Sequence, residues 1–271
     1  MISIGLISDV HYAAGKTKGN RHCHLSDAKL TECLEFFNRK NIEYVICLGD
    51  LIDQGDHPDD DQENLAKIAG ICQLYKGSFY TAIGNHDLES MTKEQFLERL
   101  GIRTRRPYYA FEIQDYRFLV LDPNFKKSGE SYRSGHFDWD DAYLPPEQIS
   151  WLSTRLNQNN YRRTFIVCHQ NLDQRLLSGQ IDPHIISNAD EVRSLIERKN
   201  QKITVIQGHF HQGYYQKIND ISYFTLTAMC EGGSMKDNSF AVLDLHDDGR
   251  VIVNGYGGQE TVEIVTRNPE W

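Results

Sequence analysis

The chain has 271 residues, of which 39% are hydrophobic, 11% aromatic and 25% charged, which is the composition of an ordinary globular protein rather than of a disordered or fibrous one. Its 29 basic and 38 acidic side chains give a net charge of −9 without a basic stripe, so nucleic acid is not expected as a partner, because phosphate backbones are bound by clustered Lys and Arg. We also expect no membrane partner and a cytoplasmic location, because the sequence has neither a run of about 18 apolar residues nor a signal-peptide pattern.

Short β-branched runs alternate with helical patterns through the first two thirds of the chain. The runs expected to form strands are residues 2–8, 44–49, 78–84, 164–169 and 203–208. Strands that alternate with helices in this way predict an α/β fold.

Several segments between these runs have the spacing or the termini of helices. Apolar residues recur at i, i+4 and i+7 after Ser26, a candidate N-cap. Residues 145–156 open with proline, which the first turn of a helix tolerates. Asn188 is a second candidate N-cap, with Glu191 placed for a capping box. The acidic run 56–63 is expected to be a solvated helix start, where carboxylates suit the helix dipole.

The rest of the chain is rich in strand patterns. Residues 108–122 have the pattern of a hairpin, and five further strands are expected after residue 213. We therefore expect either one mixed sheet or two sheets packed together. Because neither an internal repeat nor a long linker interrupts the chain, residues 1–271 are expected to form a single domain.

The five strands of the α/β part are each followed by acidic, amide or imidazole side chains. In chain order these are Asp9 and His11, Asp50 and Asp53, Asn85 and His86, His169, and finally His209 and His211. Ligand sites in α/β sheets lie outside the carboxyl ends of strands, and alternate residues of an extended segment face the same way. We therefore expect these side chains to converge at one edge of the fold.

Each fragment also has a purely structural alternative. Asp and Asn after a strand are common turn formers, and a single histidine such as His169 can be a hydrogen-bonded core residue. The recurrence of oxygen and imidazole ligands at five separate strand ends favours a metal site over five independent coincidences. Imidazole and carboxylate together suit Mn, Fe or Zn.

The order of these motifs resembles the calcineurin-like metallophosphoesterase superfamily. The motifs are Asp-x-His, Gly-Asp-x-x-Asp, Gly-Asn-His-Asp, a lone His and Gly-His-x-His, between residues 9 and 211. The resemblance implies a four-layer αββα sandwich of two mixed β-sheets flanked by helices, and a centre of two divalent metal ions. It assigns Asp9, His11 and His211 to the first ion, Asn85, His169 and His209 to the second, and Asp50 to a bridging position.

The resemblance also implies a hydrolase that acts on a small phosphodiester, pyrophosphate or phosphomonoester. Two divalent ions about 3.5–4 Å apart can generate hydroxide at neutral pH and hold the attacking and leaving oxygens of an in-line displacement at phosphorus. His86, which has no ligand role, is then expected beside the leaving oxygen or the phosphoryl charge. Asp53 is expected to fix the tautomer of His86, with a turn carboxylate as the alternative.

Some features bear on the branch of the superfamily. Gln54 stands where protein serine/threonine phosphatases have arginine, which disfavours a phosphoprotein substrate. Residues 208–215 and 223–232 are similar to the branch that contains manganese-dependent ADP-ribose/CDP-alcohol diphosphatases and bacterial alkaline-phosphatase-like phosphodiesterases. His11 departs from the diphosphatases, whose first motif often lacks its histidine. A catalytically silent metal-binding scaffold and a nuclease stay open as alternatives, although the negative charge disfavours the nuclease.

Long polar segments beside the motif strands are candidates for the substrate pocket. They are residues 11–24, 124–143 and 171–184. Long loops next to a rigid site commonly set specificity. Within them we expect Tyr12, Arg133 and His136 to contact the substrate, with solvated loop residues as the alternative.

Overall fold

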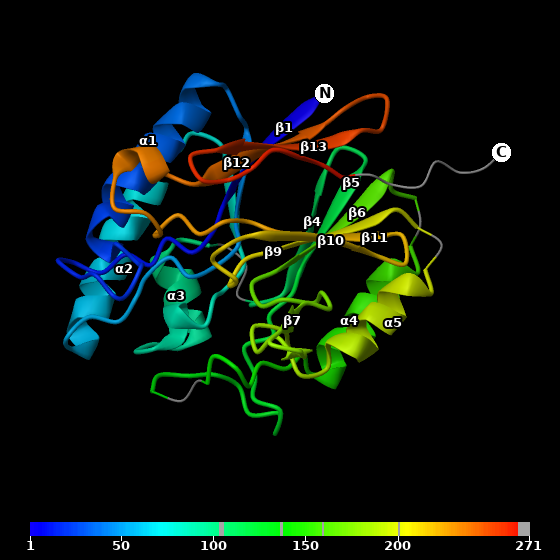
Figure 1. Cartoon of the computed structure of the whole chain (residues 1–271), viewed down its shortest axis with the longest axis horizontal. Helices are drawn as coiled ribbons and strands as arrows, with labels where there is room; N and C mark the ends of the chain where they lie inside the picture. The colour runs from blue at the N-terminus through cyan, green and yellow to red at the C-terminus, as the bar shows by residue number, and fades with distance from the viewer. Residues whose placement is uncertain (103–105, 136–137, 159, 200, 265–271) are drawn as a thin grey trace.

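The computed structural model describes residues 1–102, 106–135, 138–158, 160–199 and 201–264. Its described helices are α1 (Ser26–Arg39), α2 (Pro58–Cys72), α3 (Lys93–Arg99), α4 (Pro146–Leu156) and α5 (Ala189–Glu197), with short 3₁₀ helices η1 (Cys23–Leu25), η2 (His86–Leu88) and η3 (Met235–Asp237). Two six-stranded sheets lie between the helices (Figure 1). No helix among the described residues is both long enough and apolar enough to span a membrane.

The first sheet has the strand order β14-β13-β12-β1-β2-β3. In chain order its strands are β1 (Ile2–Ile7), β2 (Tyr44–Cys47), β3 (Ser78–Thr81), β12 (Phe240–Leu245), β13 (Val251–Tyr256) and β14 (Val262–Glu263). β1, β2 and β3 are parallel, whereas β12 pairs with β1 in the antiparallel sense, so the sheet is mixed.

The second sheet has the strand order β10-β11-β9-β6-β5-β4. In chain order its strands are β4 (Tyr109–Ile113), β5 (Tyr116–Val120), β6 (Arg163–Cys168), β9 (Ile203–Gln207), β10 (Tyr214–Ile218) and β11 (Ile221–Thr225). The four inner strands are parallel, and β4 and β10 close the two edges as antiparallel hairpins. A separate small hairpin is formed by β7 (Leu176–Leu177) and β8 (Gln180–Ile181).

Three layers of apolar side chains hold the sandwich together. Alternate residues of facing strands, such as Ile4 and Leu6 of β1 and Phe118 of β5, are buried between the two sheets. The outer face of the first sheet packs against α1, α2 and α3 through residues such as Phe37, and that of the second against α4 and α5 through residues such as Val192. Figure 1 places these two groups of helices on opposite sides of the sheets. The predicted four-layer αββα sandwich is therefore confirmed.

Two helix caps differ from the sequence prediction. α1 begins at Ser26, but its N-cap is Leu25, and Oγ of Ser26 is buried without a hydrogen-bond partner among the described residues. Asn188 does occupy the N-cap position of α5, but its amide exchanges hydrogen bonds of 3.0 and 2.9 Å with the backbone of Leu144 and does not cap the helix. A contact with the segment before α4 therefore replaces the expected cap.

Most of the other element predictions are confirmed: residues 109–120 form the β4–β5 hairpin, α4 opens on proline, and β10 to β14 follow residue 213. Three residues of the acidic run, Asp59, Asp60 and Asp61, lie in the first turn of α2 as expected, but Asp61 is buried and accepts a hydrogen bond from the N–H of Gly55, so this helix start is not fully solvated.

Candidate metal centre

The parallel strands of both sheets end in register. Ile7, Cys47 and Thr81, the last residues of β1, β2 and β3, lie side by side, and Cys168 of β6 pairs with Gln207 of β9 in the other sheet. The segments that follow therefore leave both sheets at one edge, where ligand sites of such sheets form. The structure brings all seven predicted ligands together there, six of them buried and His211 with its side chain 19% exposed.

The backbone at four of these positions is strained. Asp9, His11, Asp50 and His209 have φ values of 53°, 49°, 55° and 68°. Residues other than glycine adopt this left-handed region rarely, at a cost of order 1–3 kcal/mol. Backbone hydrogen bonds between the strand ends hold it, such as that from His11 N–H to the carbonyl of Asp50 at 2.9 Å. Backbone strain of this kind is typical of functional sites, where the direction of a side chain is needed for binding or catalysis although it costs stability.

Glycines precede several of the ligands because the strand ends approach each other closely. A Cβ at Gly84 would overlap Oδ1 of Asp50, and a Cβ at Gly208 would overlap Oγ of Ser8. The Gly-Asn-His-Asp and Gly-His-x-His motifs therefore begin with glycine because there is no room for a side chain at these positions, and not only because glycine favours turns.

Asp87 ties the ends of β2 and β3 together beneath the ligands. Its buried carboxylate accepts hydrogen bonds of 2.8–3.3 Å from the backbone N–H groups of Asp50, Leu51, Ile52 and Gly84. Burial and the charge of Asp50 raise the pKa of Asp87 to about 7, while the backbone donors stabilise the ionised form. Asp87 thus positions Asp50 through the backbone N–H groups of its loop.

The first group of ligand atoms belongs to Asp9, His11, His211 and Asp50. Nε2 of His11 lies 3.8 Å from Oδ1 of Asp9 and 3.3 Å from Oδ2 of Asp50. Nε2 of His211 lies 3.6 Å from the same Asp9 oxygen and 3.2 Å from Nε2 of His11. Atoms that each bind one ion at about 2.0–2.2 Å lie roughly 3–4 Å from one another, so this spacing suits a single cation.

The second group belongs to Asp50, Asn85, His169 and His209. Nε2 of His169 lies 3.1 Å from Oδ2 of Asp50 and 3.2 Å from Oδ1 of Asn85. A ring nitrogen of His209 lies within 4.8 Å of the ligand atoms of Asp50 and His169. Oδ2 of Asp50 is therefore common to both groups.

The donor set fits two metal ions. Oδ2 of Asp50 and Nε2 of His209 are buried and accept or donate no hydrogen bond within the part of the chain that the structure describes. Nδ1 of His169 faces the carbonyl of Leu48 at 2.8 Å, so we infer that Nδ1 carries a proton in either charge state and that Nε2, the nitrogen that faces Asp50, is the one that would bind a cation after losing its own proton. Buried polar atoms without partners cost free energy, and a cation between them removes that cost.

Two further imidazoles are oriented by carboxylates. Nδ1 of His211 lies 2.9 Å from Oε1 of Glu231, and Nδ1 of His11 lies 3.2 Å from Oδ2 of Asp53. Both contacts leave Nε2 facing the centre, in the arrangement common for metal-binding histidines.

The carboxylates of the centre attract positive charge. Burial is the largest single influence on His11 and His169 and alone would lower both pKa values. The carboxylate of Asp50 and the other acidic neighbours together outweigh it, so the pKa of His11 is raised to about 10 and that of His169 to about 9. Burial would likewise raise the pKa of Asp9, but its hydrogen bond with His11 and the charges of His169 and His211 hold it below its usual range. The arrangement therefore favours positive charge, either as protons or as metal ions.

His86 lies beside the first group of ligands. Its ring centroid is 4.8 Å from that of His11, and its backbone N–H donates to Oδ1 of Asp50 at 2.8 Å. Nδ1 contacts a carboxylate oxygen of Glu89, and Nε2 lies 3.3 Å from Nη1 of Arg21. Its side chain is 20% exposed.

Asp53 lies beside His86, as expected, but contacts His11 and Arg21 more closely. Its Oδ1 lies 3.9 Å from Nδ1 of His86, whereas its Oδ2 lies 3.2 Å from Nδ1 of His11 and 2.7 Å from Nη1 of Arg21. Glu89 occupies the position against His86 that the sequence analysis gave to Asp53. The carboxylate of Asp53 instead orients His11 and pairs with Arg21.

The expected substrate contacts lie in different surroundings. Tyr12 is 4% exposed, within the apolar core, and its hydroxyl accepts a hydrogen bond of 2.8 Å from Lys67, so it offers no free face to a substrate. Arg133 is exposed and pairs with Glu130 at 3.2 Å. His136 lies outside the described residues.

The sequence analysis missed the polar groups that support the ligands. Arg21 lies in the candidate segment 11–24, and Glu231 lies in residues 223–232, which are similar to one branch of the superfamily, but no role was expected for either side chain. Glu89 lies three residues after His86, a spacing that brings the two side chains together in the turn η2, and this local signal could have identified it.

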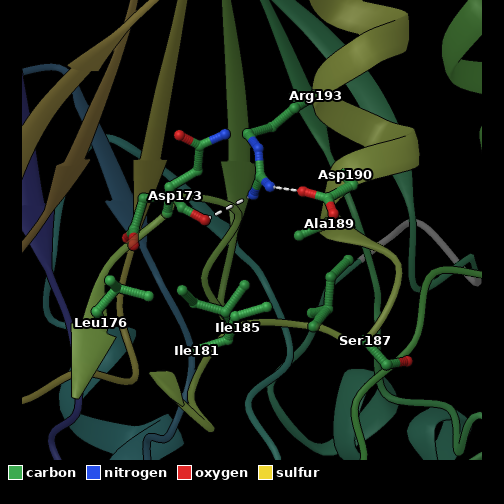
Figure 2. A pocket seen from close by; sticks show the side chains of 10 residues that line it. Asp173, Leu176, Ile181, Ile185, Ser187, Ala189, Asp190 and Arg193 are labelled. Atoms are coloured by element: carbon green, nitrogen blue, oxygen red, sulfur yellow. Dashed lines mark hydrogen bonds and ion pairs between the residues drawn. The ribbon is translucent and has the colours of Figure 1, made fainter. Parts of the chain in front are cut away.

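A separate cavity of about 430 Å³ adjoins the candidate segment 171–184 (Figure 2). Leu176, Ile181 and Ile185 line its apolar part, and Arg193 of α5 pairs with Asp190 at its other side. None of the seven predicted ligands is among its described lining residues. The segment therefore borders a cavity with one apolar and one charged side in addition to the metal centre.

Comparisons with known proteins agree with this fold. A family model described as calcineurin-like phosphoesterase matches residues 2–213. The chain is 25% identical over 297 residues to a manganese-dependent ADP-ribose/CDP-alcohol diphosphatase of Arabidopsis thaliana, covering 93% of this chain and 94% of that protein. It is 24% identical over 242 residues to a 3′,5′-cyclic-nucleotide phosphodiesterase of Nostoc sp., covering 89% of this chain and 83% of that protein. Its fold is similar to that of a dimetal phosphatase from Danio rerio, with a TM-score of 0.83 at 19% identity over 98% of this chain and 99% of the other.

Proposed function

This chain belongs to the calcineurin-like phosphoesterase family, and we propose that it is a two-metal hydrolase of the phosphodiester or pyrophosphate bond in a small nucleotide-derived molecule. The position of Asp50 is the observation that carries the proposal, because its Oδ2 lies within 3.3 Å of imidazoles that follow strands of both sheets. The relatives from Arabidopsis and Nostoc are both named for nucleotide-derived phosphate esters. Phosphomonoesters are the alternative substrates.

Each chemical group of the centre has a proposed role. Asp9, His11 and His211 would hold one ion, Asn85, His169 and His209 the other, and Asp50 would bridge them. When bound, such a pair of ions supplies Lewis acidity and positive charge to an in-line displacement at phosphorus. Imidazole with carboxylate suits Mn, Fe or Zn, and the name of the Arabidopsis relative favours manganese.

His86 and Arg21 would contact the phosphoryl group from the open side. Because Glu89 engages Nδ1 of His86, its Nε2 is the nitrogen that would face the phosphoryl group, and it could hold a proton for the leaving oxygen when Arg21 donates to the phosphate and not to Nε2. Nη1 of Arg21 lies 3.3 Å from that nitrogen, and a guanidinium binds phosphate oxygens well. Asp53 would balance the charge of Arg21 and orient His11.

We further propose that residues 1–271 act as one catalytic domain. The proposed ligands follow β1, β2 and β3 of the first sheet and β6 and β9 of the second. Neither sheet alone would contain both ions.

Hydrolysis assays test the proposed function. The purified protein would be treated with EDTA, supplied again with Mn²⁺, and assayed on ADP-ribose, a CDP-alcohol, cyclic AMP, bis-p-nitrophenyl phosphate and p-nitrophenyl phosphate. We expect turnover only after Mn²⁺ is restored, and faster hydrolysis of the diesters and pyrophosphates than of the monoester. A protein that binds two ions but hydrolyses none of these esters would be a metal-binding scaffold, and cleavage of single-stranded DNA alone would indicate a nuclease.

A further inference from the structure

Two aromatic rings border the second group of ligands and have no role in the chemistry proposed above. The ring centroid of His184 lies 4.9 Å from that of His209, in an edge-to-face arrangement. The ring of Trp139 lies 5.2 Å from His184 and 6.3 Å from His209. The rings come from the candidate segments 171–184 and 124–143, and together they form a wall beside His209.

A buried hydrogen-bond network fixes the ring of His184. Its Nδ1 lies 2.6 Å from Oδ1 of Asp182, and Oδ2 of Asp182 accepts from Nε of Arg175 at 2.9 Å. Arg175 also donates to Asp173 at 3.1 Å and to Asn171 at 2.8 Å, and these partners are all buried. The network uses Nδ1, while Nε2 forms no hydrogen bond with any other described residue. Because the His184 side chain is 25% exposed, its free edge is available to a ligand.

Trp139 presents an open indole beside this imidazole. Its side chain is 42% exposed, although tryptophan is highly buried on average. The turn that carries it is fixed, because the hydroxyl of Tyr132 and the N–H of Asp141 both donate to the carbonyl of Asp138. A positioned indole at the border of a phosphate-binding centre offers a face on which a planar ring can stack.

The surrounding charge selects the kind of ring. Asp138, Asp140 and Asp141 flank the indole in the sequence, and their carboxylates repel a further phosphate group. The occupant should therefore be uncharged and planar. A nucleobase meets both conditions, and its polar edge can bond Nε2 of His184.

We propose that Trp139 and His184 form a nucleobase subsite. The base of a nucleotide-derived substrate stacks on the indole, its polar edge bonds Nε2 of His184, and its phosphate reaches the ligands around His209. This inference deepens the proposed function and rests on it.

Binding of small products separates the contribution of the base from that of the phosphate. AMP, CMP, ribose 5-phosphate and inorganic phosphate would be titrated calorimetrically into the manganese-loaded protein. We expect AMP or CMP to bind at least about tenfold more tightly than ribose 5-phosphate, because stacking of one base on an aromatic side chain contributes an affinity of that order. Trp139→Ala should reduce this preference to about threefold or less, and His184→Gln should reduce it in part.

Controls distinguish a subsite from a general defect. Metal content and the affinities for ribose 5-phosphate and inorganic phosphate should be unchanged in Trp139→Ala. Trp151→Phe, on α4 against Tyr108, should keep the full preference for the base.

Two results would overturn the subsite: AMP and CMP that bind no more tightly than ribose 5-phosphate, or a preference that survives Trp139→Ala. Ester hydrolysis combined with either result would refute the subsite while the proposed function stands. A base preference that depends on Trp139 in a protein that hydrolyses no ester would refute the proposed function instead.

Discussion

At the scale of single residues, Asp50 connects the two halves of the centre. Asp50→Asn keeps the size of the side chain but removes the charge that faces His11 and His169. We expect the metal content to fall below two ions per chain and turnover to fall by more than about 100-fold, because a neutral amide is a poor bridging ligand. Elemental analysis and the ester assays measure both effects. Asp56→Asn, at an exposed carboxylate paired with Lys16, is the control. An Asp50→Asn protein that stayed active with two tightly held ions would contradict the bridging role.

His86 allows catalysis to be separated from metal binding. We expect His86→Ala to lower turnover by ~10²–10⁴-fold, the usual contribution of a positioned acid, while both ions and the melting temperature are retained. If His86 protonates the leaving oxygen, alkyl or nucleoside esters should lose more activity than p-nitrophenyl esters, since p-nitrophenolate leaves without help. Equal losses would indicate that the ring binds a phosphoryl oxygen. Unchanged activity on both kinds of ester would exclude a catalytic role, and loss of an ion would make His86 a support of the centre.

At the scale of elements, α1 supports the centre through a buried lysine. Nζ of Lys29 donates to three carbonyls in residues 229–232 at 2.6–3.0 Å, and this segment presents Glu231 to His211. Lys29→Met leaves those carbonyls without their donor, so we expect a loss of about 2–4 kcal/mol in the free energy of unfolding and roughly 10–100-fold weaker Mn²⁺ binding. Chemical denaturation and calorimetry measure these, with Lys40→Met at the exposed end of α1 as the control. Unchanged Mn²⁺ affinity in a destabilised variant would show that Lys29 supports only the fold.

The sequence predicts the elements whose signal is local and fails where distant contacts compete. The periodicity of apolar residues predicts the strands and helices of the sandwich, because an element that buries one face repeats its apolar residues at the period of a helix or a strand. The cap expected at Asn188 was wrong because Leu144 offers its amide better partners. The candidate ligands could be proposed because strand ends mark them. Lys29 could not, because its carbonyl partners lie 200 or more residues away along the chain.

At the scale of the whole molecule, the centre joins the two sheets. The N–H of His209, after β9 of the second sheet, donates to both carboxylate oxygens of Asp9, after β1 of the first, at 3.2 Å. Nδ1 of His169, after β6, donates to the carbonyl of Leu48, after β2, at 2.8 Å. Any cation that binds these groups therefore stabilises the packing of one sheet on the other, by an amount that grows with its concentration.

Protonation should compete with metal binding across the same interface. The folded-state pKa values of about 10 for His11 and about 9 for His169 exceed the ordinary value of about 6.5, so we expect both rings to be protonated at pH 7 in the metal-free protein. Their stabilising contribution is fully present below about pH 6.5 and is lost as the pH rises through about 9–10. A metal ion must displace these protons, so its affinity should rise over that window.

We therefore expect Mn²⁺ binding at pH 7 to release roughly one to two protons per chain, and the increase in melting temperature caused by Mn²⁺ to be larger at pH 8.5 than at pH 6.5. Calorimetry in buffers of different ionisation enthalpy counts the protons. Asp50→Asn should release fewer, because the Asp50 carboxylate is the largest of the influences that raise the pKa of both His11 and His169. If no protons were released and the stabilisation by Mn²⁺ were equal at the two pH values, His11 and His169 would be neutral before the metal binds, and the carboxylates would not set the charge of the centre.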